Sequence, residues 1–389
     1  MTTVQANEPP GYQVIASACI RCAGCATVAP GLFEVGPSAA RASRAPASPL
    51  EHGLSRAAAL LCPSGAIVRG GEHAGAGTPP SRARQVLADS IYHHSLIEAE
   101  NVRWRMGDLP LEAIDASQVT DGLRRLVRQV ALSEATTFTA STRFLHEFAD
   151  DADLSQWIAV WLYEEGRHPQ AMMAWLSALG ESVPGPDLVR ARATTPFIRS
   201  RSGTLVMNVI SEVIAAGRYL ALARRAPEPA LARIAAWLAA DEARHGATFF
   251  RYARRQLERS TDVEAEKLVA LKVLYFWLFE RSEVQHPVNL FGDTAHRDPL
   301  LASAMDSMGL DTPRLERRLC GVVGELIELP LEGPEAVMPA LRAQAARSRL
   351  GHARSLREAT GGPSAAEVLV GSAPTQSRDP AARSGGTHG

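Results

Sequence analysis

Apolar residues recur at the spacing of amphipathic helices over most of the chain after residue 85. Four long windows, 120–149, 154–179, 204–225 and 228–257, carry apolar residues at i, i+3, i+4 and i+7. Acidic residues, glycines and prolines lie between these windows, as is typical of helix ends. Because strand-like runs are short and few, the pattern predicts a mainly α fold built as a helix bundle.

The two ends of the chain have a different composition. Residues 1–68 hold four of the five cysteines and few helical patterns, which favours a small α+β domain there. Residues 69–84 are rich in Gly, Pro, Ala, Ser and Arg, as flexible linkers are. Residues 361–389 are also rich in small residues and Arg, so we expect a disordered tail. The helical domain then spans residues 85–360.

Acidic and histidine side chains interrupt two of the apolar stripes. The segments WLYEEGRH and WLAADEARH each contain Glu-x-x-His. The pairs are Glu165/His168 and Glu242/His245. This spacing places both side chains on one helix face, where they can reach a common metal ion. A charged group on the core face of a helix is costly unless it is paired or bound to metal. A third pair, Glu283/His286, is followed at once by proline, and we interpret it as chance.

Each of the two segments is preceded by one glutamate on an apolar stripe. Glu134 lies 31 residues before the first motif glutamate, and Glu212 lies 30 residues before the second. Four carboxylates and two imidazoles are the ligand set of a di-iron centre, in which two carboxylates bridge the metals. The alternative is a set of buried salt bridges to Arg143, Arg167 and Arg244, but these arginines fall mostly off the stripes. The predicted ligands of two Fe ions are Glu134, Glu165, His168, Glu212, Glu242 and His245.

The clustered cysteines have the spacing of an iron–sulfur site. Cys19, Cys22 and Cys25 are separated by two residues each, and the distant Cys62 precedes a proline. Zinc is the alternative, although zinc ligands usually come as two Cys-x-x-Cys pairs. The flanking sequence over about residues 11–69 resembles small bacterial single-cluster ferredoxins. We therefore predict one 4Fe–4S cluster on these four cysteines.

The helical domain resembles the soluble ferritin-like acyl-acyl carrier protein desaturases over roughly residues 100–330. The resemblance rests on EEGRH and ADEARH, on the two upstream glutamates, and on Trp104 in the segment VRWRMGDLP. It implies a ferritin-like bundle whose di-iron ligands are the six residues named above. It also implies an electron route through Trp104, Asp241 and His168, in which Asp241 directly precedes a ligand glutamate.

The resemblance implies an enzyme that activates dioxygen and desaturates an acyl chain on acyl carrier protein, with electrons from the fused iron–sulfur domain. Plant desaturases carry a threonine where this chain has Ala215, so a hydroxylase or N-oxygenase of secondary metabolism is the alternative. A non-enzymatic ferritin-like protein for iron storage or redox sensing is less favoured. A radical-generating subunit like that of ribonucleotide reductase requires a tyrosine beside the ligands, and Tyr163 and Tyr219 are the nearest in sequence.

Charge and hydropathy restrict the partners. With 41 Lys and Arg against 42 Asp and Glu, the net charge of −1 argues against nucleic acid. The sequence predicts no membrane span and no signal peptide, so we expect a cytoplasmic protein. Arg190, Arg192, Arg199 and Arg201 form either a docking site for an acidic carrier protein or a solvated loop. The other expected partners are an upstream ferredoxin or flavoprotein reductase and a second copy in a homodimer.

Overall fold

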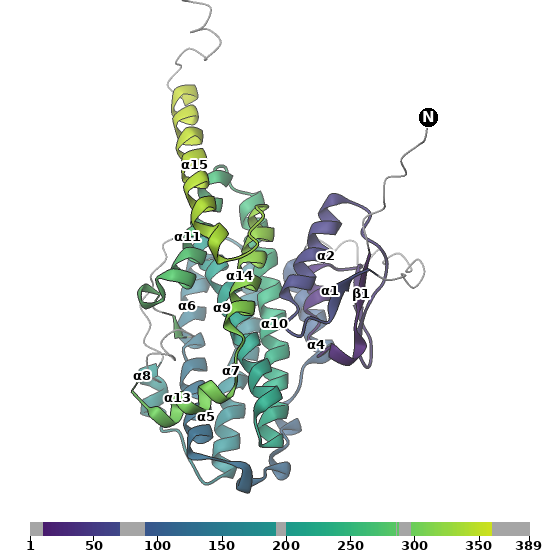
Figure 1. Ribbon diagram of the computed structural model, residues 1–389, viewed down its shortest axis with the longest axis vertical. Helices are drawn as coiled ribbons and strands as arrows, with labels where there is room; N and C mark the ends of the chain where they lie inside the picture. The colour runs from purple at the N-terminus through teal and green to yellow at the C-terminus, as the bar shows by residue number, and fades with distance from the viewer. Residues whose placement is uncertain (1–10, 71–89, 192–199, 285, 288–296, 360–389) are drawn as a thin grey trace, which may run out of the picture.

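Long helices make up most of the structure, and a small α+β unit lies at one side (Figure 1). The computed structural model describes residues 11–70, 90–191, 200–284, 286–287 and 297–359. The α-helices are α1 Gly24–Val28, α2 Pro49–Leu61, α4 Ile91–Val102, α5 Asp121–Glu134, α6 Thr137–Glu147, α7 Ala152–Ala178, α8 Gly185–Ala191, α9 Arg201–Arg225, α10 Pro229–Glu258, α11 Val263–Phe279, α13 Pro299–Ser307, α14 Thr312–Ile327 and α15 Val337–Ala359. Short 3-10 turns, η1 to η6, lie at Ala16–Ala18, Met106–Asp108, Leu111–Ala113, Ala116–Gln118, Arg281–Glu283 and Pro334–Ala336. The predicted mainly α fold with a small α+β domain is confirmed.

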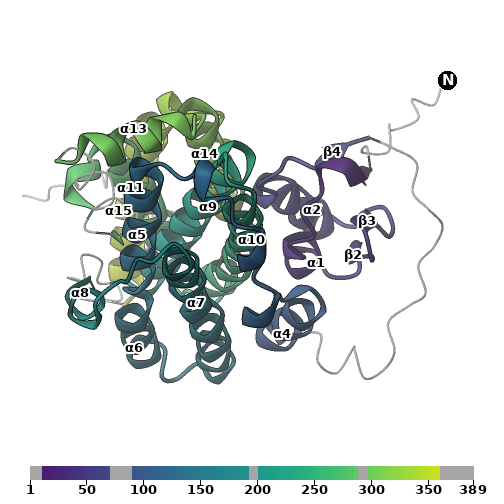
Figure 2. The ribbon, with the colours of Figure 1, turned by 90° about the horizontal axis from the view of Figure 1, so that it is seen from below.

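The bundle core lies between α5, α6, α7, α9 and α10, which Figure 2 shows end on. Helices α9 and α10 pack along each other, while α5 and α6 pack on α7. Side chains cap the starts of the long helices: Asp151 accepts from the backbone N–H of Leu154, and Ser200 accepts from that of Gly203. Each such cap stabilises its helix by about 1 kcal/mol. The windows predicted over 154–179, 204–225 and 228–257 correspond to α7, α9 and α10.

The single helix predicted over residues 120–149 is wrong. Helix α5 ends at Glu134, and the next helix, α6, begins only at Thr137. The hydroxyl of Thr136 donates to the carbonyl of Ser133 at 2.7 Å, which is a local bond that competes with helix continuation. Both helices bury the same apolar face, so hydrophobic periodicity does not reveal the break. Its consequence is that Glu134 closes α5 at the level of the bundle core.

The small unit contains two antiparallel strand pairs and the helices α1 and α2. Strand β1, Tyr12–Val14, pairs with β4, Ile67–Arg69, and β2, Phe33–Val35, pairs with β3, Ala40–Ala42. Strand β4 therefore ends one residue beyond the predicted domain boundary at 68. Most of the predicted linker at 69–84 and the whole predicted tail at 361–389 lie outside the described residues.

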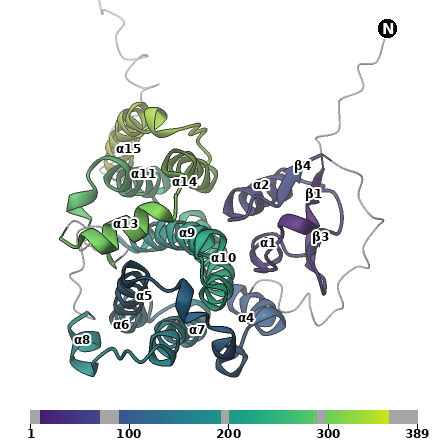
Figure 3. The same cartoon turned by 60° about the horizontal axis from the view of Figure 1, so that its bottom comes forward.

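The small unit is held against the bundle by apolar packing and by hydrogen bonds. Helix α1 packs on α10 and α2 packs on α14 (Figure 3). A Cβ at Gly321 of α14 would lie only 3.0 Å from Leu60 Cδ2, so α2 approaches α14 very closely. Arg318 donates to the carbonyls of Leu60 and Leu61 at 2.6 and 2.7 Å. These contacts fix the orientation of the cysteine-bearing unit on the helices.

Helix α9 is the one described helix that is long and apolar enough to cross a membrane by length and composition. In the bundle, 78% of its most apolar window is buried by protein. Its hydropathy is therefore that of a central core helix.

Candidate metal centres

The six predicted iron ligands come together at the middle of the bundle. Glu134 is supplied by α5, Glu165 and His168 by α7, Glu212 by α9, and Glu242 and His245 by α10. Each is buried except Glu134, which is half-buried. Gly246 brings two of the helices close at this level, because a Cβ there would lie 3.2 Å from the Cβ of Glu212.

These side chains form two overlapping groups whose candidate ligand atoms lie within 4.8 Å of one another. One group is Glu134, Glu165, His168 and Glu242, and the other is Glu165, Glu212, Glu242 and His245. The groups share Glu165 and Glu242, which is the arrangement of two bridging carboxylates. Among the described residues, Glu283 and His286 belong to neither group, in agreement with their interpretation as a chance pair.

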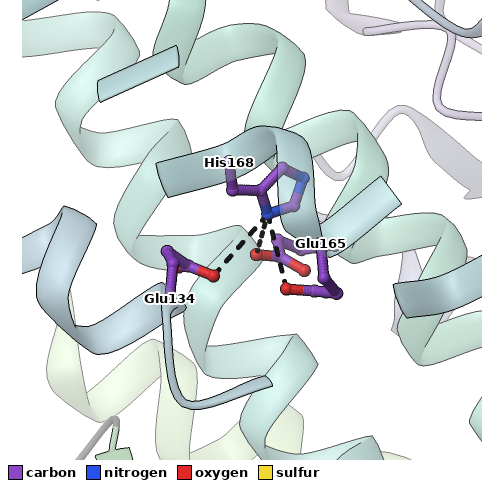
Figure 4. A group of neighbouring side chains, drawn as sticks. Glu134, Glu165 and His168 are labelled. Carbon is purple, nitrogen blue, oxygen red and sulfur yellow. Dashed lines mark ion pairs between the residues drawn. The ribbon is translucent and has the colours of Figure 1, made fainter. Parts of the chain in front are cut away.

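Each histidine turns its Nδ1 atom toward the carboxylates. The Nδ1 atom of His168 lies 3.7 Å from Glu134 and 3.6 Å from Glu165 (Figure 4). It also lies 3.4 Å from Glu242. Within the described part of the chain this buried nitrogen makes no hydrogen bond. The Nδ1 atom of His245 lies 2.8 Å from Glu165 and 3.2 Å from Glu242. A buried nitrogen facing three carboxylates without a hydrogen bond fits a metal ion placed between them.

Burial and the close approach of the carboxylates raise the pKa values of several groups of the site. Burial and the nearby Glu242 raise the pKa of Glu165 to about 8. Burial, Glu242 and Glu165 likewise raise the pKa of Glu212 well above its usual range. Although burial opposes it, the carboxylates also raise the pKa of His168. Two metal cations would replace these protons, so the donor set fits a di-iron centre.

Two further acids hold the histidines from the opposite helix. Asp241 of α10 lies 3.3 Å from His168 Nε2, and Glu164 of α7 lies 3.0 Å from His245 Nε2. An acceptor at Nε2 selects the tautomer that leaves Nδ1 free to bind metal. Sequence reasoning missed Glu164, although it directly precedes a ligand glutamate as Asp241 does.

Buried arginines neutralise these two acids. The Nη2 atom of Arg244 lies 2.9 Å from Glu164 and 2.8 Å from Asp241. Arg167 lies 3.3 Å from Asp241, and Arg103 lies 3.0 Å from Glu164. Arg167 and Arg244, which the periodicity places off the ligand stripes, are nevertheless both buried. They pair with the acids behind the histidines rather than with the predicted ligands, because the Glu-x-Arg-His spacing turns them toward the neighbouring helix.

The structure brings the three residues of the predicted electron route into contact. Trp104 is buried, and its Nε1 atom donates to Asp241 at 2.8 Å, on the carboxylate oxygen that faces His168. Trp104 also stacks on Trp237, with ring centroids 5.7 Å apart. Arg167 donates to the Trp104 carbonyl and lies over its ring. Electron transfer by these residues remains a prediction.

One further residue touches a predicted ligand. The hydroxyl of Tyr219 donates to Glu134 through a short hydrogen bond, and burial raises the pKa of Tyr219. Tyr219 lies two turns after Glu212 on the same face of α9, so helical spacing contained the signal. The sequence marks Tyr219 only as one of the two tyrosines nearest the ligands, and the structure places it against Glu134.

The four predicted cluster cysteines line one small cavity of the N-terminal unit. Arg21 and Ala23 have φ values of 55° and 62°, and this left-handed backbone curls the loop around the cavity. The backbone N–H of Ala40 points at Cys19 Sγ, 3.3 Å away. Burial and the nearby Cys62 raise the pKa of Cys22 to about 12. Four converging sulfurs in an otherwise apolar cavity fit a cluster that needs thiolates.

Two family models match the chain. The model described as 4Fe-4S single cluster domain of Ferredoxin I matches residues 15–68, and the Rubrerythrin model matches residues 204–289. The second match spans Glu212, Glu242 and His245. No curated protein matches the chain.

The protein is therefore a redox iron protein. It carries one 4Fe–4S cluster in a ferredoxin-like domain and a di-iron centre in a ferritin-like helical domain. Neither match is to the acyl carrier protein desaturases, so that resemblance enters the proposal below.

We expect iron and acid-labile sulfide analysis of the purified protein to find about six irons and four sulfides per chain. Four irons belong to the cluster and two to the bundle. Zinc in place of cluster iron, with no visible absorption band, would contradict the assignment of the cysteines.

Proposed function

We propose that the protein is a dioxygen-dependent oxidoreductase that receives electrons from its own cluster and oxidises an apolar chain. The favoured reaction is desaturation of an acyl chain on acyl carrier protein, and hydroxylation or N-oxygenation is the alternative. The proposal rests on a mostly apolar cavity whose lining includes the candidate iron ligand Glu134.

This cavity, of about 160 Å³, lies between α5, α9 and the residues around α13. Most of its lining is apolar, and it includes Leu126, Val130, Ala215, Leu222 and Met305. Its polar lining residues are Ser133, Glu134, Arg218 and Tyr219. A mostly apolar cavity with a few polar groups beside a metal site is a typical small-molecule pocket.

When bound, the iron pair supplies the activation of dioxygen, and the chain supplies position and proton control. The apolar wall excludes water from the end of the cavity and aligns a hydrocarbon chain beside Glu134. Burial raises the pKa of Tyr219 and so keeps its hydroxyl protonated, and this hydroxyl donates a hydrogen bond to Glu134 Oε1. Asp241 and Glu164 keep both histidines in the tautomer that leaves Nδ1 free.

A second cavity, of about 280 Å³, adjoins the first and carries positive charge. Both cavities include Ala221, Met308 and Leu310 in their lining. The arginines of the second cavity are Arg224, Arg225, Arg314 and Arg318, and its one acid is Asp311. Burial and the neighbouring Arg314 lower the pKa of Arg318 to about 10. Such a surplus of guanidinium groups suits a phosphate, so we propose that the phosphate of a carrier arm binds here.

The basic segment predicted as a docking site is less suited to this role. Arg190 pairs with Asp187, and Arg201 pairs with Asp150 at 2.7 Å. Arg192 and Arg199 lie outside the described residues. The described arginines of that segment already have carboxylate partners, whereas those of the second cavity outnumber its acid.

The reaction is tested by incubating the reduced holoprotein and oxygen with acyl carrier proteins that bear chains of different length, followed by mass spectrometry. Loss of two hydrogens supports desaturation, and gain of one oxygen supports the oxygenase alternative. Consumption of oxygen without any modified chain would contradict both and would favour a non-enzymatic iron protein.

Charge reversal at the second cavity is expected to weaken carrier binding selectively. Arg314→Glu should raise the KM for a carrier-bound chain about tenfold, because a phosphate then meets a carboxylate. The matched control is Arg317→Glu, since Arg317 is also exposed on α14 but does not line the cavity. Equal effects of both variants, measured by steady-state kinetics, would show that the cavity does not bind the carrier.

The contact between Tyr219 and Glu134 supports a second candidate, a radical-generating subunit. Electron paramagnetic resonance of the reduced protein after exposure to oxygen separates the two. A stable tyrosyl signal that disappears in Tyr219→Phe favours the radical function. Its absence, together with a modified chain, favours the enzyme.

A further inference from the structure

The cysteine loop lies directly on the helix that carries two predicted iron ligands. A Cβ at Gly24 would lie 3.1 Å from the backbone oxygen of Ala243 and 3.5 Å from Cys22 Sγ. Ala243 follows the ligand Glu242 and precedes Arg244 on α10. The absence of a side chain at Gly24 therefore lets the cluster loop touch α10 at the level of the di-iron centre.

Arg244 lies between the cysteine loop and the di-iron site. Its hydrogen bonds are made only to acids on the di-iron side. Its side chain is 2% exposed, and its Nη2 atom bonds both Glu164 and Asp241. Its Nε and Nη1 atoms are also buried, and within the described residues they have no hydrogen-bond partner. Buried guanidinium donors rarely go unused, so these two atoms are available to an acceptor, and the cysteine loop lies against the preceding residue, Ala243.

We propose that Arg244 is the positioning residue that couples the 4Fe–4S cluster to the di-iron centre. In this proposal its unpaired N–H groups serve an acceptor of the cysteine loop, while its bonded Nη2 reaches the two acids that hold His168 and His245. The path runs from the Cys22 loop through the guanidinium to Asp241 and Glu164, and then to both histidines. The inference rests on the part of the proposed function in which the cluster reduces the irons.

Each transfer in this proposal moves one electron from the cluster to the iron pair. The reduced cluster is oxidised by one electron and one ferric ion becomes ferrous, so two transfers reduce the pair. The electrons come from an external low-potential donor protein, a flavoprotein or a ferredoxin. Trp104 reaches the same Asp241 through its indole N–H and stacks on Trp237, so it is the competing route.

The experiment measures intramolecular transfer without substrate or oxygen. The cluster of the oxidised holoprotein is photoreduced in a flash, and recovery of its visible absorbance is followed while rapid-freeze Mössbauer spectra report ferrous iron in the bundle. Arg244→Met should slow the recovery about tenfold or more, as is usual when a group behind metal ligands is removed. Arg244→Lys should restore part of the rate, because it keeps the charge but not the fork of donors. The cluster reduction potential is measured in each variant, because a bonded guanidinium stabilises the reduced cluster and its loss should lower the potential.

Two further variants show whether a slower transfer in Arg244→Met could be due to misfolding. Gly24→Val should push the cluster loop away from Ala243 and slow the transfer, although it alters no residue of the di-iron centre. Arg251→Met is the matched control, since Arg251 is a half-buried arginine on α10, two turns further along, and should leave the rate within about twofold. Iron and sulfide content are measured for every variant.

The outcomes separate this inference from the proposed function. If the cluster of the parent protein does not pass its electron to the bundle irons, the proposed self-reduction fails. The role of Arg244 is overturned if the parent protein transfers its electron and both variants, Arg244→Met and Gly24→Val, have the same transfer rate and the same cluster potential as the parent. A loss confined to Trp104→Phe would assign the path to the indole.

Discussion

Replacement of Glu165 by glutamine is expected to remove both irons of the bundle while leaving the cluster intact. Glu165 belongs to both ligand groups, and its two oxygens face His168 and His245 separately. Glutamine keeps the volume of the side chain but removes the negative charge that two cations require. The iron content should fall from about six to about four per chain, and oxygen-dependent turnover should fall by at least about a hundredfold.

The chance motif provides the control for this prediction. Glu283 also begins a Glu-x-x-His pair, but it is exposed and lies outside both ligand groups. Glu283→Gln should therefore keep all irons and full turnover. The readouts are iron analysis, the visible spectrum of the cluster and oxygen uptake. Retention of two bundle irons in Glu165→Gln would show that Glu165 does not bridge them.

The six candidate ligands could be named from the sequence because buried charge is rare. A glutamate on an otherwise apolar helix face needs a partner, and the repeated spacing of Glu134 and Glu212 before the two motifs pairs the helices. The structure brings these residues together as the pattern requires. The cysteine spacing was equally informative, since few folds bring Cys62 back to a Cys-x-x-Cys-x-x-Cys loop.

Features that depend on how helices face each other could not be predicted from periodicity. The crossed bonds from Glu164 to His245 and from Asp241 to His168 join different helices, so no pattern within one helix contains them. The break after Glu134 depends on a local bond by Thr136, which leaves the apolar stripe unchanged. The contact of Gly24 with α10 depends on how the two units pack against each other. The sequence of either unit alone does not contain this information.

Removal of the metals is expected to make the stability of the bundle depend strongly on alkaline pH. In the metal-free protein the folded state raises the pKa of Glu165 from 4.5 to about 8 and raises that of Glu212 in the same direction. It also raises the pKa values of His168 and His245, although burial opposes both shifts. All four groups bind protons more tightly when folded. Their contribution to stability is full below the unfolded pKa and is lost as pH rises through the folded pKa.

The metal-free protein should therefore unfold at a lower temperature near pH 9 than near pH 6. Each lost kcal/mol lowers the melting temperature by about 2–4 °C for a domain of this size. The iron-loaded protein should lack this decline, because metal cations then occupy the places of the protons. Glu165→Gln offers an internal check, since an amide does not titrate and the metal-free variant should lose less stability between the two pH values. Differential scanning calorimetry of the metal-free, loaded and variant proteins makes the comparison. If all three decline equally, the titrating groups lie outside the iron site and the close approach of its carboxylates is not what governs the alkaline limit.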